Sequence, residues 1–137
     1  MKNLANFKLF ISKPGKFVIT THFKPDADAL GSSLALARYL SKKNHEVSLV
    51  TPSDYPDILR WMSGSENIVA VDPSINTVPQ EAIQQITAAD GIFCVDFSRL
   101  SRVGVLADLV RDSAGKRILI DHHLEPENFA EFEQWDS

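Results

Sequence analysis

Short apolar runs alternate with amphipathic stretches along this chain. Four of the runs are rich in β-branched and aromatic residues: residues 16–22, 46–52, 91–96 and 117–123. Continuous apolar runs of this length are typical of strands that are buried on both faces of a parallel sheet. The pattern therefore predicts four central strands.

The stretches between these runs carry apolar residues at helical spacing. The clearest is residues 28–43, where Leu30, Leu34, Ala37 and Leu40 form one stripe, and Asn44 is expected to end this helix. Further helices are predicted at residues 79–88 and 101–113, and Gly115 is expected to end the second. Shorter helices are predicted at residues 3–11 and 56–62. Residues 73–80 are predicted to form a loop, and residues 67–71 are a small apolar run. Alternating strands and helices predict an α/β fold with three layers, a parallel sheet with helices on both faces.

Length and composition fit one globular domain. The chain has 137 residues, of which 44% are hydrophobic and 23% charged, and no apolar run is long enough to span a membrane. The N-terminus lacks the apolar core of a signal peptide, so we expect a cytoplasmic protein without a membrane partner. A net charge of −4 argues against coating of duplex nucleic acid, but it is compatible with a short anionic substrate held by metal ions. The single cysteine, Cys94, reads as a small buried hydrophobe.

Unusual polar residues follow three of the predicted strands. They include three of the four histidines in the chain: His22, Asp26, Asp28, Asp96, Asp121, His122 and His123. Ligands bind parallel sheets at the carboxyl ends of the strands, so these side chains meet in one cleft if adjacent strands carry them. The fourth histidine, His45, lies in a polar turn and is expected to be a solvated surface residue.

A mixture of imidazoles and carboxylates suits Mn²⁺ well and Mg²⁺ less well, and the lack of thiolates argues against structural zinc. Several carboxylates so close together need cations to neutralise them. Two ions about 3.5–4 Å apart would do so and would also generate a nucleophile for phosphoester hydrolysis. Asp96 is the natural bridge between them, because it comes from a different strand from the other carboxylates.

A simpler interpretation exists for each stretch. Asp26 and Asp28 precede a helix and are of the residue type that caps helices, and Asp96 is open to the same reading. The adjacent histidines are compatible with a partly exposed turn. Capping does not call for histidine, however, so the coincidence at three strand ends favours a metal site.

The same residues resemble a known family. HFKPDADALGS, VDFSRLSRVG and IDHH resemble, in order, the first three motifs of the DHH family of phosphoesterases, and the resemblance runs from residue 17 to residue 123. The first motif is most similar to that of small oligoribonucleases that also remove the 3′-phosphate from 3′-phosphoadenosine 5′-phosphate. The resemblance implies a manganese-dependent phosphoesterase with short RNA or a nucleotide phosphate as substrate.

The resemblance also implies a role for each residue. His22, Asp26 and Asp96 match the ligands of one Mn²⁺, and Asp28, Asp96 and His122 match those of the second. His123 matches the residue that contacts the scissile phosphate and helps to protonate the leaving group, and Asp121 matches an aspartate that orients a histidine. Further candidates for binding substrate are Gly31 and Ser32, as the opening of a helix whose N–H groups approach an anion, and Arg102, as a phosphate clamp or a solvated arginine.

One departure from the family pattern affects the expected activity. Members carry a fourth motif with a further aspartate ligand, followed by a C-terminal substrate-binding domain, whereas this sequence ends at Ser137. We therefore expect residues 1–137 to be a single catalytic domain, truncated before both features, that keeps the fold but hydrolyses substrate poorly. The tail, with Phe129, Phe132 and Trp135 alternating, is expected to form a last edge segment.

Two alternative functions stay open. One is a non-catalytic nucleotide-binding or regulatory module with the same fold, and the other is a pyrophosphatase or exopolyphosphatase of the same superfamily. A dinucleotide-binding domain fits the alternation of elements, but no GxGxxG motif follows the first strand. The oligomeric state, including a homodimer, stays open as well.

Overall fold

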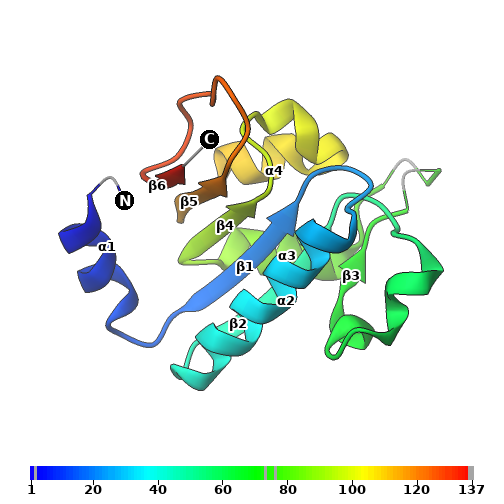
Figure 1. Cartoon of the computed structure of the whole chain (residues 1–137), viewed down its shortest axis with the longest axis horizontal. Coiled ribbons are helices and arrows are strands. Elements are labelled where there is room, and N and C mark those ends of the chain that lie inside the picture. Colours follow the sequence, from blue (N-terminus) through cyan, green and yellow to red (C-terminus); the bar gives the residue numbers. More distant parts are fainter. Residues whose placement is uncertain (2, 73, 76, 136–137) are drawn as a thin grey trace.

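The computed structural model of the protein describes residues 1, 3–72, 74–75 and 77–135. Six strands form one parallel sheet in the order β3-β2-β1-β4-β5-β6 (Figure 1). Their bounds are Lys16–Thr21 for β1, Glu46–Thr51 for β2, Val69–Ala70 for β3, Gly91–Val95 for β4, Lys116–Asp121 for β5 and Phe132–Trp135 for β6. The four central strands lie where the apolar runs predict them. The predicted edge segment in the tail is β6, which pairs with β5.

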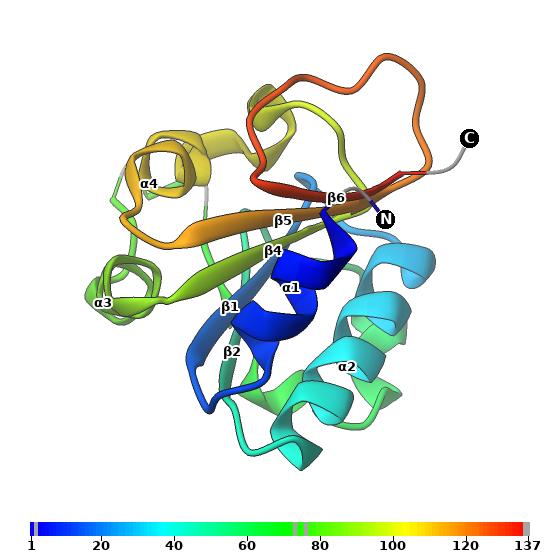
Figure 2. The ribbon, with the colours of Figure 1, turned by 90° about the vertical axis from the view of Figure 1, so that its left-hand side faces the viewer.

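Helices cover both faces of the sheet, as Figure 2 shows. Helices α1 (Leu4–Ile11) and α2 (Ala27–Lys42) lie on one face, and α3 (Gln80–Ala88) and α4 (Ala107–Asp112) lie on the other. Alternate residues of β1 enter the two cores: Phe17 and Ile19 pack with Leu40 of α2, whereas Val18 packs with Ile86 of α3. The predicted three-layer α/β fold is therefore confirmed. In the described residues, no helix combines the length and the apolar character that crossing a bilayer requires.

The prediction of one continuous helix at residues 101–113 is wrong. A 3₁₀ segment, Leu100–Leu106, precedes α4, and Gly104 inside it has φ 53° and ψ −127°, which no helix contains. The segment predicted at 56–62 is likewise a 3₁₀ helix, Asp57–Trp61, and another short one follows at Ser65–Asn67. Helical spacing of apolar residues thus located these segments but did not reveal the break at the glycine.

The two predicted helix ends have different outcomes. Asn44 has φ 69°, and its N–H donates to the Ser41 carbonyl oxygen at 3.1 Å, so it ends α2 as expected. Gly115 does not end α4 in this way, because the helix stops at Asp112 and Ser113 is already extended. A glycine is needed at 115 for another reason: a Cβ there would lie 2.5 Å from the Ala89 carbonyl oxygen.

His45 is buried, so its prediction as a solvated surface residue is wrong. It is 7% exposed, its Nδ1 accepts a hydrogen bond from the Gly15 N–H at 3.1 Å, and its ring lies 4.6 Å from the ring of Phe17. The chain entering β1 supplies both partners, which are distant in sequence. Cys94 is buried as predicted, and burial raises the pKa of its thiol well above the usual range.

The strand order reverses between β1 and β4. The chain runs outward from β1 to β2 and β3, then returns to β4 on the other side of β1 and continues to β5 and β6. Loops that leave β1 and β4 at their carboxyl ends diverge to opposite sides, and such a switch point is where parallel sheets bind ligands. The fold therefore directs attention to the residues that follow β1, β4 and β5.

Candidate metal centre

Three adjacent strands bring the predicted polar residues together at the carboxyl edge of the sheet. His22 follows the last residue of β1, Asp96 follows the last residue of β4, and Asp121 is the last residue of β5. The residue pairs Thr21–Val95 and Val95–Ile120 are in register, so the three strands end at the same level. The expected convergence of distant loops is thus present in the fold.

His22 is buried with its ring oriented by the backbone. Its Nδ1 lies 2.8 Å from the carbonyl oxygen of Phe23, and a carbonyl can only accept, so Nδ1 carries a proton and donates it. Its Nε2 lies 3.5 Å from Asp96 Oδ2 and 4.0 Å from Asp26 Oδ1. A backbone bond that fixes one ring nitrogen while the other faces carboxylates is a common arrangement of metal-binding histidines.

Asp96 lies between two histidines. Its Oδ2 faces His22, and its Oδ1 lies 3.0 Å from Nε2 of His122, so each carboxylate oxygen contacts one imidazole. The residue is 8% exposed and has φ 64°, in the left-handed region, while its N–H donates to the Ile120 carbonyl oxygen at 3.0 Å. Backbone strain of this kind is concentrated at functional sites. The strained turn thus places the carboxylate between His22, which follows β1, and His122, which follows β5.

Asp26 acts as the N-cap of α2. Its Oδ1 accepts a hydrogen bond from the Ala29 N–H at 3.0 Å, as the capping interpretation requires. The same oxygen faces His22, and a carboxylate has a second oxygen and several lone pairs. Capping and metal binding are therefore compatible at this position. In the described part of the chain, His22, Asp26 and Asp96 form a group whose ligand atoms all lie within 4.8 Å of one another.

The residues expected around a second ion are arranged differently. Asp96, Asp121, His122 and His123 form the other such group among the described residues, and Asp28 belongs to neither group. Asp28 is exposed on the first turn of α2 and lines a cavity of about 290 Å³ together with Asp96 and His122. Asp28 therefore borders the same cavity as Asp96 and His122, but its carboxylate does not belong to the group of ligand atoms within 4.8 Å of one another.

Asp121 is fully buried and holds His123. Its Oδ1 lies 2.6 Å from His123 Nδ1, and its Oδ2 accepts the backbone N–H of the same residue at 3.1 Å. The carboxylate can only accept, so the proton between them is on Nδ1. His122 is 63% exposed in its side chain, and its ring lies 4.7 Å from that of His123. The two histidines thus have separate partners, Asp96 and Asp121.

The residues proposed to contact substrate lie near this centre in different ways. Gly31 and Ser32 were expected at the opening of a helix, and this prediction is wrong. Helix α2 begins at Ala27, and the N–H groups of its second turn bond within the helix. Ser32 nevertheless lines the cavity beside Asp28. Arg102 is exposed, and its carbonyl oxygen accepts the N–H of Phe23 at 2.6 Å, which places its backbone beside the His22 loop.

Sequence reasoning missed Gln134, which lines the same cavity from β6. It is in register with Ile120 at the end of β5. The edge strand is held by Arg117, whose guanidinium bonds the carboxylate of Glu131, the Phe129 carbonyl oxygen at 3.3 Å and the Ser113 carbonyl oxygen at 3.0 Å. The alternating aromatic residues of the tail indicated a strand, but not which polar residue of it would face the site.

The donor set fits a divalent cation. Three imidazoles and four carboxylates converge on the edge of the sheet, and carboxylate and imidazole ligands together suit Mn²⁺ and related ions. Without positive charge, the carboxylates of Asp26, Asp96 and Asp121 would repel one another in a partly buried site. The residues present therefore fit the metal that the motif pattern implies.

Comparison with known proteins identifies the family. Residues 16–135 match the DHH family, N-terminal domain. The chain is 31% identical over 121 residues to the cyclic-di-AMP phosphodiesterase PdeA of Listeria monocytogenes serotype 1/2a (strain 10403S), a match that covers 87% of this chain and 18% of the relative. It is also similar to the crystal structure of an exopolyphosphatase-related protein from Bacteroides fragilis, with a TM-score of 0.89 and 36% identity.

These likenesses cover nearly all of this chain but only part of each relative. The structural match covers 97% of this chain and 38% of the other protein. Members of the family are phosphoesterases and generally depend on divalent metal ions. The three ordered motifs, the switch-point geometry and the match over residues 16–135 lead to one conclusion: the chain belongs to the DHH family and contains its N-terminal domain.

Proposed function

We propose that this domain supplies the catalytic centre of a Mn²⁺-dependent phosphoesterase that hydrolyses small nucleotide substrates. The observation that carries the proposal is the position of Asp96, one oxygen of which faces His22 and the other His122. A carboxylate shared in this way is suited to bridge two ions. His22 and Asp26 complete one side of the bridge, and His122 and Asp28 stand on the other.

The chain's own residues supply orientation and proton transfer. The Phe23 carbonyl oxygen fixes the tautomer of His22 and leaves its Nε2 directed at the carboxylates. Bound ions would neutralise the carboxylates, polarise the phosphate and lower the pKa of water. His123, held through Nδ1 by the buried Asp121, is placed to donate a proton to the departing oxygen.

The substrate class rests on the motifs and on one relative. The first motif is similar to that of oligoribonucleases that also act on 3′-phosphoadenosine 5′-phosphate, and one similar protein is a cyclic-di-AMP phosphodiesterase. All three substrates are adenine nucleotides or short RNA with a phosphoester linkage. We therefore assign short oligoribonucleotides and 3′-phosphoadenosine 5′-phosphate as the first substrates to test and cyclic di-AMP as the third.

A second candidate is hydrolysis of inorganic phosphoanhydrides. The likeness to an exopolyphosphatase-related protein favours it, at 36% identity over nearly the whole chain. The same metal centre would serve both reactions, because both displace an oxygen from phosphorus. Only the groups that contact the rest of the substrate would differ.

The test combines metal binding with hydrolysis. Mn²⁺ binding is measured by isothermal titration calorimetry on the wild-type chain and on Asp96→Asn. Release of phosphate or nucleotide is then measured with a diadenylate, 3′-phosphoadenosine 5′-phosphate, cyclic di-AMP and tripolyphosphate. We expect Mn²⁺ binding that Asp96→Asn abolishes, and turnover of at least one nucleotide in Mn²⁺ but not in EDTA.

Each other outcome selects an alternative. Turnover of tripolyphosphate alone would favour the phosphoanhydride hydrolase. Mn²⁺ binding with nucleotide binding but no turnover would favour the non-catalytic module. Absence of Mn²⁺ binding to the wild-type chain would contradict the metal centre itself.

A further inference from the structure

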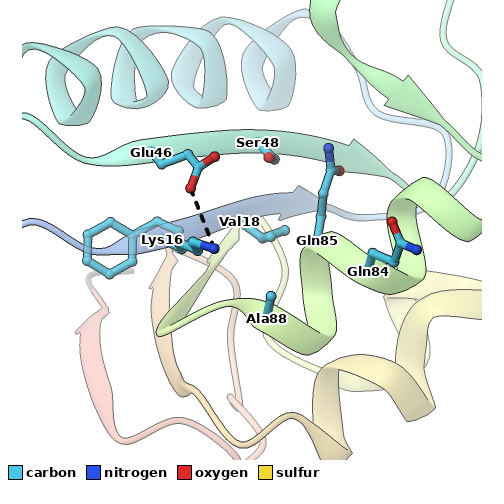
Figure 3. A pocket seen from close by; sticks show the side chains of 8 residues that line it. Lys16, Val18, Glu46, Ser48, Gln84, Gln85 and Ala88 are labelled. Atoms are coloured by element: carbon cyan, nitrogen blue, oxygen red, sulfur yellow. Dashed lines mark ion pairs between the residues drawn. The ribbon is translucent and has the colours of Figure 1, made fainter.

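A second cavity lies at the opposite end of the strands from the metal centre. It has a volume of about 300 Å³, and Lys16 and Glu46, the first residues of β1 and β2, line it. Val18, the lining residue farthest along β1, lies four residues before His22, so about 13 Å of strand separates the cavity from the metal centre. Helix α3 forms its other wall (Figure 3). Its volume is at the low end of the range for small-molecule sites, about 300–1,000 Å³.

One end of this cavity holds an unpaired acceptor. Gln85 reaches from α3 to the level of β2, as Figure 3 shows. Its Oε1 is buried and, among the described residues, has no hydrogen-bond partner. A buried carboxamide oxygen without a donor is unfavourable, and a turn of the amide about its last torsion brings the oxygen to the cavity, so this end of the cavity favours a ligand that brings an N–H group.

The other end carries a loose ion pair. Lys16 Nζ and Glu46 Oε2 are 4.0 Å apart, and their side chains are 62% and 73% exposed, so little free energy is lost when a ligand separates them. The carboxylate of Asp90 is nearby and accepts the Lys16 backbone N–H at 2.8 Å. One cation beside two carboxylates disfavours an anionic ligand and favours hydroxyl donors. A carboxylate in this setting can accept hydrogen bonds from a vicinal diol, as carboxylates do from ribose.

The floor between the two ends is partly apolar. Val18 and Ala88 line it, and Ser48 stands opposite Val18 in the strand register. A flat ring over this floor would place an amino group at one end and hydroxyl groups at the other. A glutamine amide also matches the edge of an adenine, which presents an amino group beside a ring nitrogen.

We propose that this cavity is a second ligand site, which binds a nucleoside with an exocyclic amino group, adenosine being the probe, without its phosphate and without metal ions. The base amino group donates to Gln85, the base lies on Val18 and Ala88, and the ribose diol bonds the Glu46 carboxylate. The site is separate from the metal centre in position and in chemistry.

The ligand series tests both ends of the cavity. Isothermal titration calorimetry in EDTA measures adenosine against purine riboside, which lacks the amino group, and against 2′,3′-dideoxyadenosine, which lacks the diol. We expect each deletion to weaken binding about 10-fold. AMP is expected to bind more weakly than adenosine, because its phosphate approaches the carboxylates of Glu46 and Asp90.

The variants test the residues. Gln85→Leu keeps the size of the side chain and removes the amide, and we expect it to weaken adenosine binding about 10-fold and to abolish the preference over purine riboside. Gln80→Leu, at the exposed first residue of the same helix and outside the cavity, is the matched control and should bind as the wild type does. Glu46→Gln, at an exposed strand end, should remove the preference for the diol. Asp96→Asn should bind adenosine unchanged.

Several results would overturn the proposal. They are the absence of adenosine binding at millimolar concentration, equal affinity for adenosine and purine riboside, and unchanged affinity in Gln85→Leu. Thermal melting of each variant shows whether it is folded. If Gln85→Leu does not fold, Glu46→Gln and the ligand series decide the question. Loss of adenosine binding in Asp96→Asn or a requirement for Mn²⁺ would assign the ligand to the metal centre instead.

Discussion

The parallel strands begin at one side of the sheet, the amino edge, and end at the other, the carboxyl edge. Each of these two edges buries a histidine, and the two rings have opposite surroundings. His45, at the amino edge, accepts a backbone N–H from Gly15 and lies against the ring of Phe17. His22, at the carboxyl edge, donates to a backbone carbonyl and turns its other nitrogen toward Asp26 and Asp96. Their exposures are nearly equal, 7% and 8%. Burial alone therefore does not distinguish a structural histidine from a candidate ligand, whereas the type of partner does.

The aspartates of the two edges differ in the same way. Asp90, at the amino edge, accepts the backbone N–H of Lys16, which fixes the entry of β1. Asp96, at the carboxyl edge, faces two imidazoles and has a left-handed backbone conformation. A polar side chain whose partners are backbone groups alone stabilises the fold, whereas one that also faces other ionisable side chains is a candidate ligand. The same substitution made at matching positions of the two edges tests this distinction.

The largest expected effect comes from Asp96→Asn. Loss of one carboxylate shared by two imidazoles should weaken Mn²⁺ binding by at least about 100-fold, since even the residues behind a ligand contribute about 10–100-fold. Any metal-dependent phosphoesterase activity should fall with it. Calorimetric titration with Mn²⁺ measures the first effect, and phosphate release measures the second.

The matched control is Asp90→Asn at the opposite edge. An asparagine still offers an oxygen to the Lys16 N–H, so Mn²⁺ affinity should stay at the wild-type value. Equal losses of Mn²⁺ affinity in the two variants would show that net charge, not coordination, attracts the ion.

The fold could be predicted because its signals are local and repeated. Each central strand is a continuous apolar run, and the amphipathic stretches between them alternate with the strands in the order that parallel sheets require. The break at Gly104 and the 3₁₀ geometry of Asp57–Trp61 were missed, because apolar spacing does not distinguish tight helical turns from an α-helix. Strand order became visible only in the structure.

The site could be predicted in composition but not in detail. Strand exits placed His22, Asp96 and His122 at one edge, because parallel strands end together. The burial of His45 depends on Gly15 and Phe17, about thirty residues away, and no local pattern reports such a contact. Gln134 was missed for the same reason: its position depends on the register of β6 against β5.

The next effect is on stability at the amino edge. Gly115→Ala should lower the free energy of unfolding by about 3 kcal/mol, because the new Cβ would lie 2.5 Å from the Ala89 carbonyl oxygen and backbone must move. Urea denaturation followed by circular dichroism measures it. Ala114→Gly, at the neighbouring exposed position, controls for a general effect of substitution in this turn. A loss below about 1 kcal/mol in Gly115→Ala would show that the turn relaxes freely.

The two histidines should separate when stability is measured with and without metal. His45→Ala should lower the free energy of unfolding by about 2 kcal/mol in EDTA, since the Gly15 N–H loses its acceptor and Phe17 loses a contact. Added Mn²⁺ should stabilise this variant as much as the wild type. His22→Ala should instead lose the stabilisation by Mn²⁺, because an ion stabilises only the state that binds it. Identical responses of the two variants to Mn²⁺ would erase the distinction between the edges.

The smallest effect concerns Gly31, which contrasts with Gly115 in having open space around it. A Cβ at 31 would meet no atom within 4 Å, and the residue lies inside α2, so Gly31→Ala should raise the free energy of unfolding by about 0.5–1 kcal/mol. The absence of a side chain at Gly31 leaves room for a bound molecule to approach the helix backbone. If that is the substrate, the stabilised variant should show a several-fold higher KM with unchanged Mn²⁺ affinity. Ala35→Gly, one turn further along the same helix, should lower stability by about the same amount and leave KM unchanged. A Gly31→Ala variant that is more stable and binds substrate normally would remove this glycine from the substrate site and leave Ser32, in the cavity beside Asp28, as the contact on this helix.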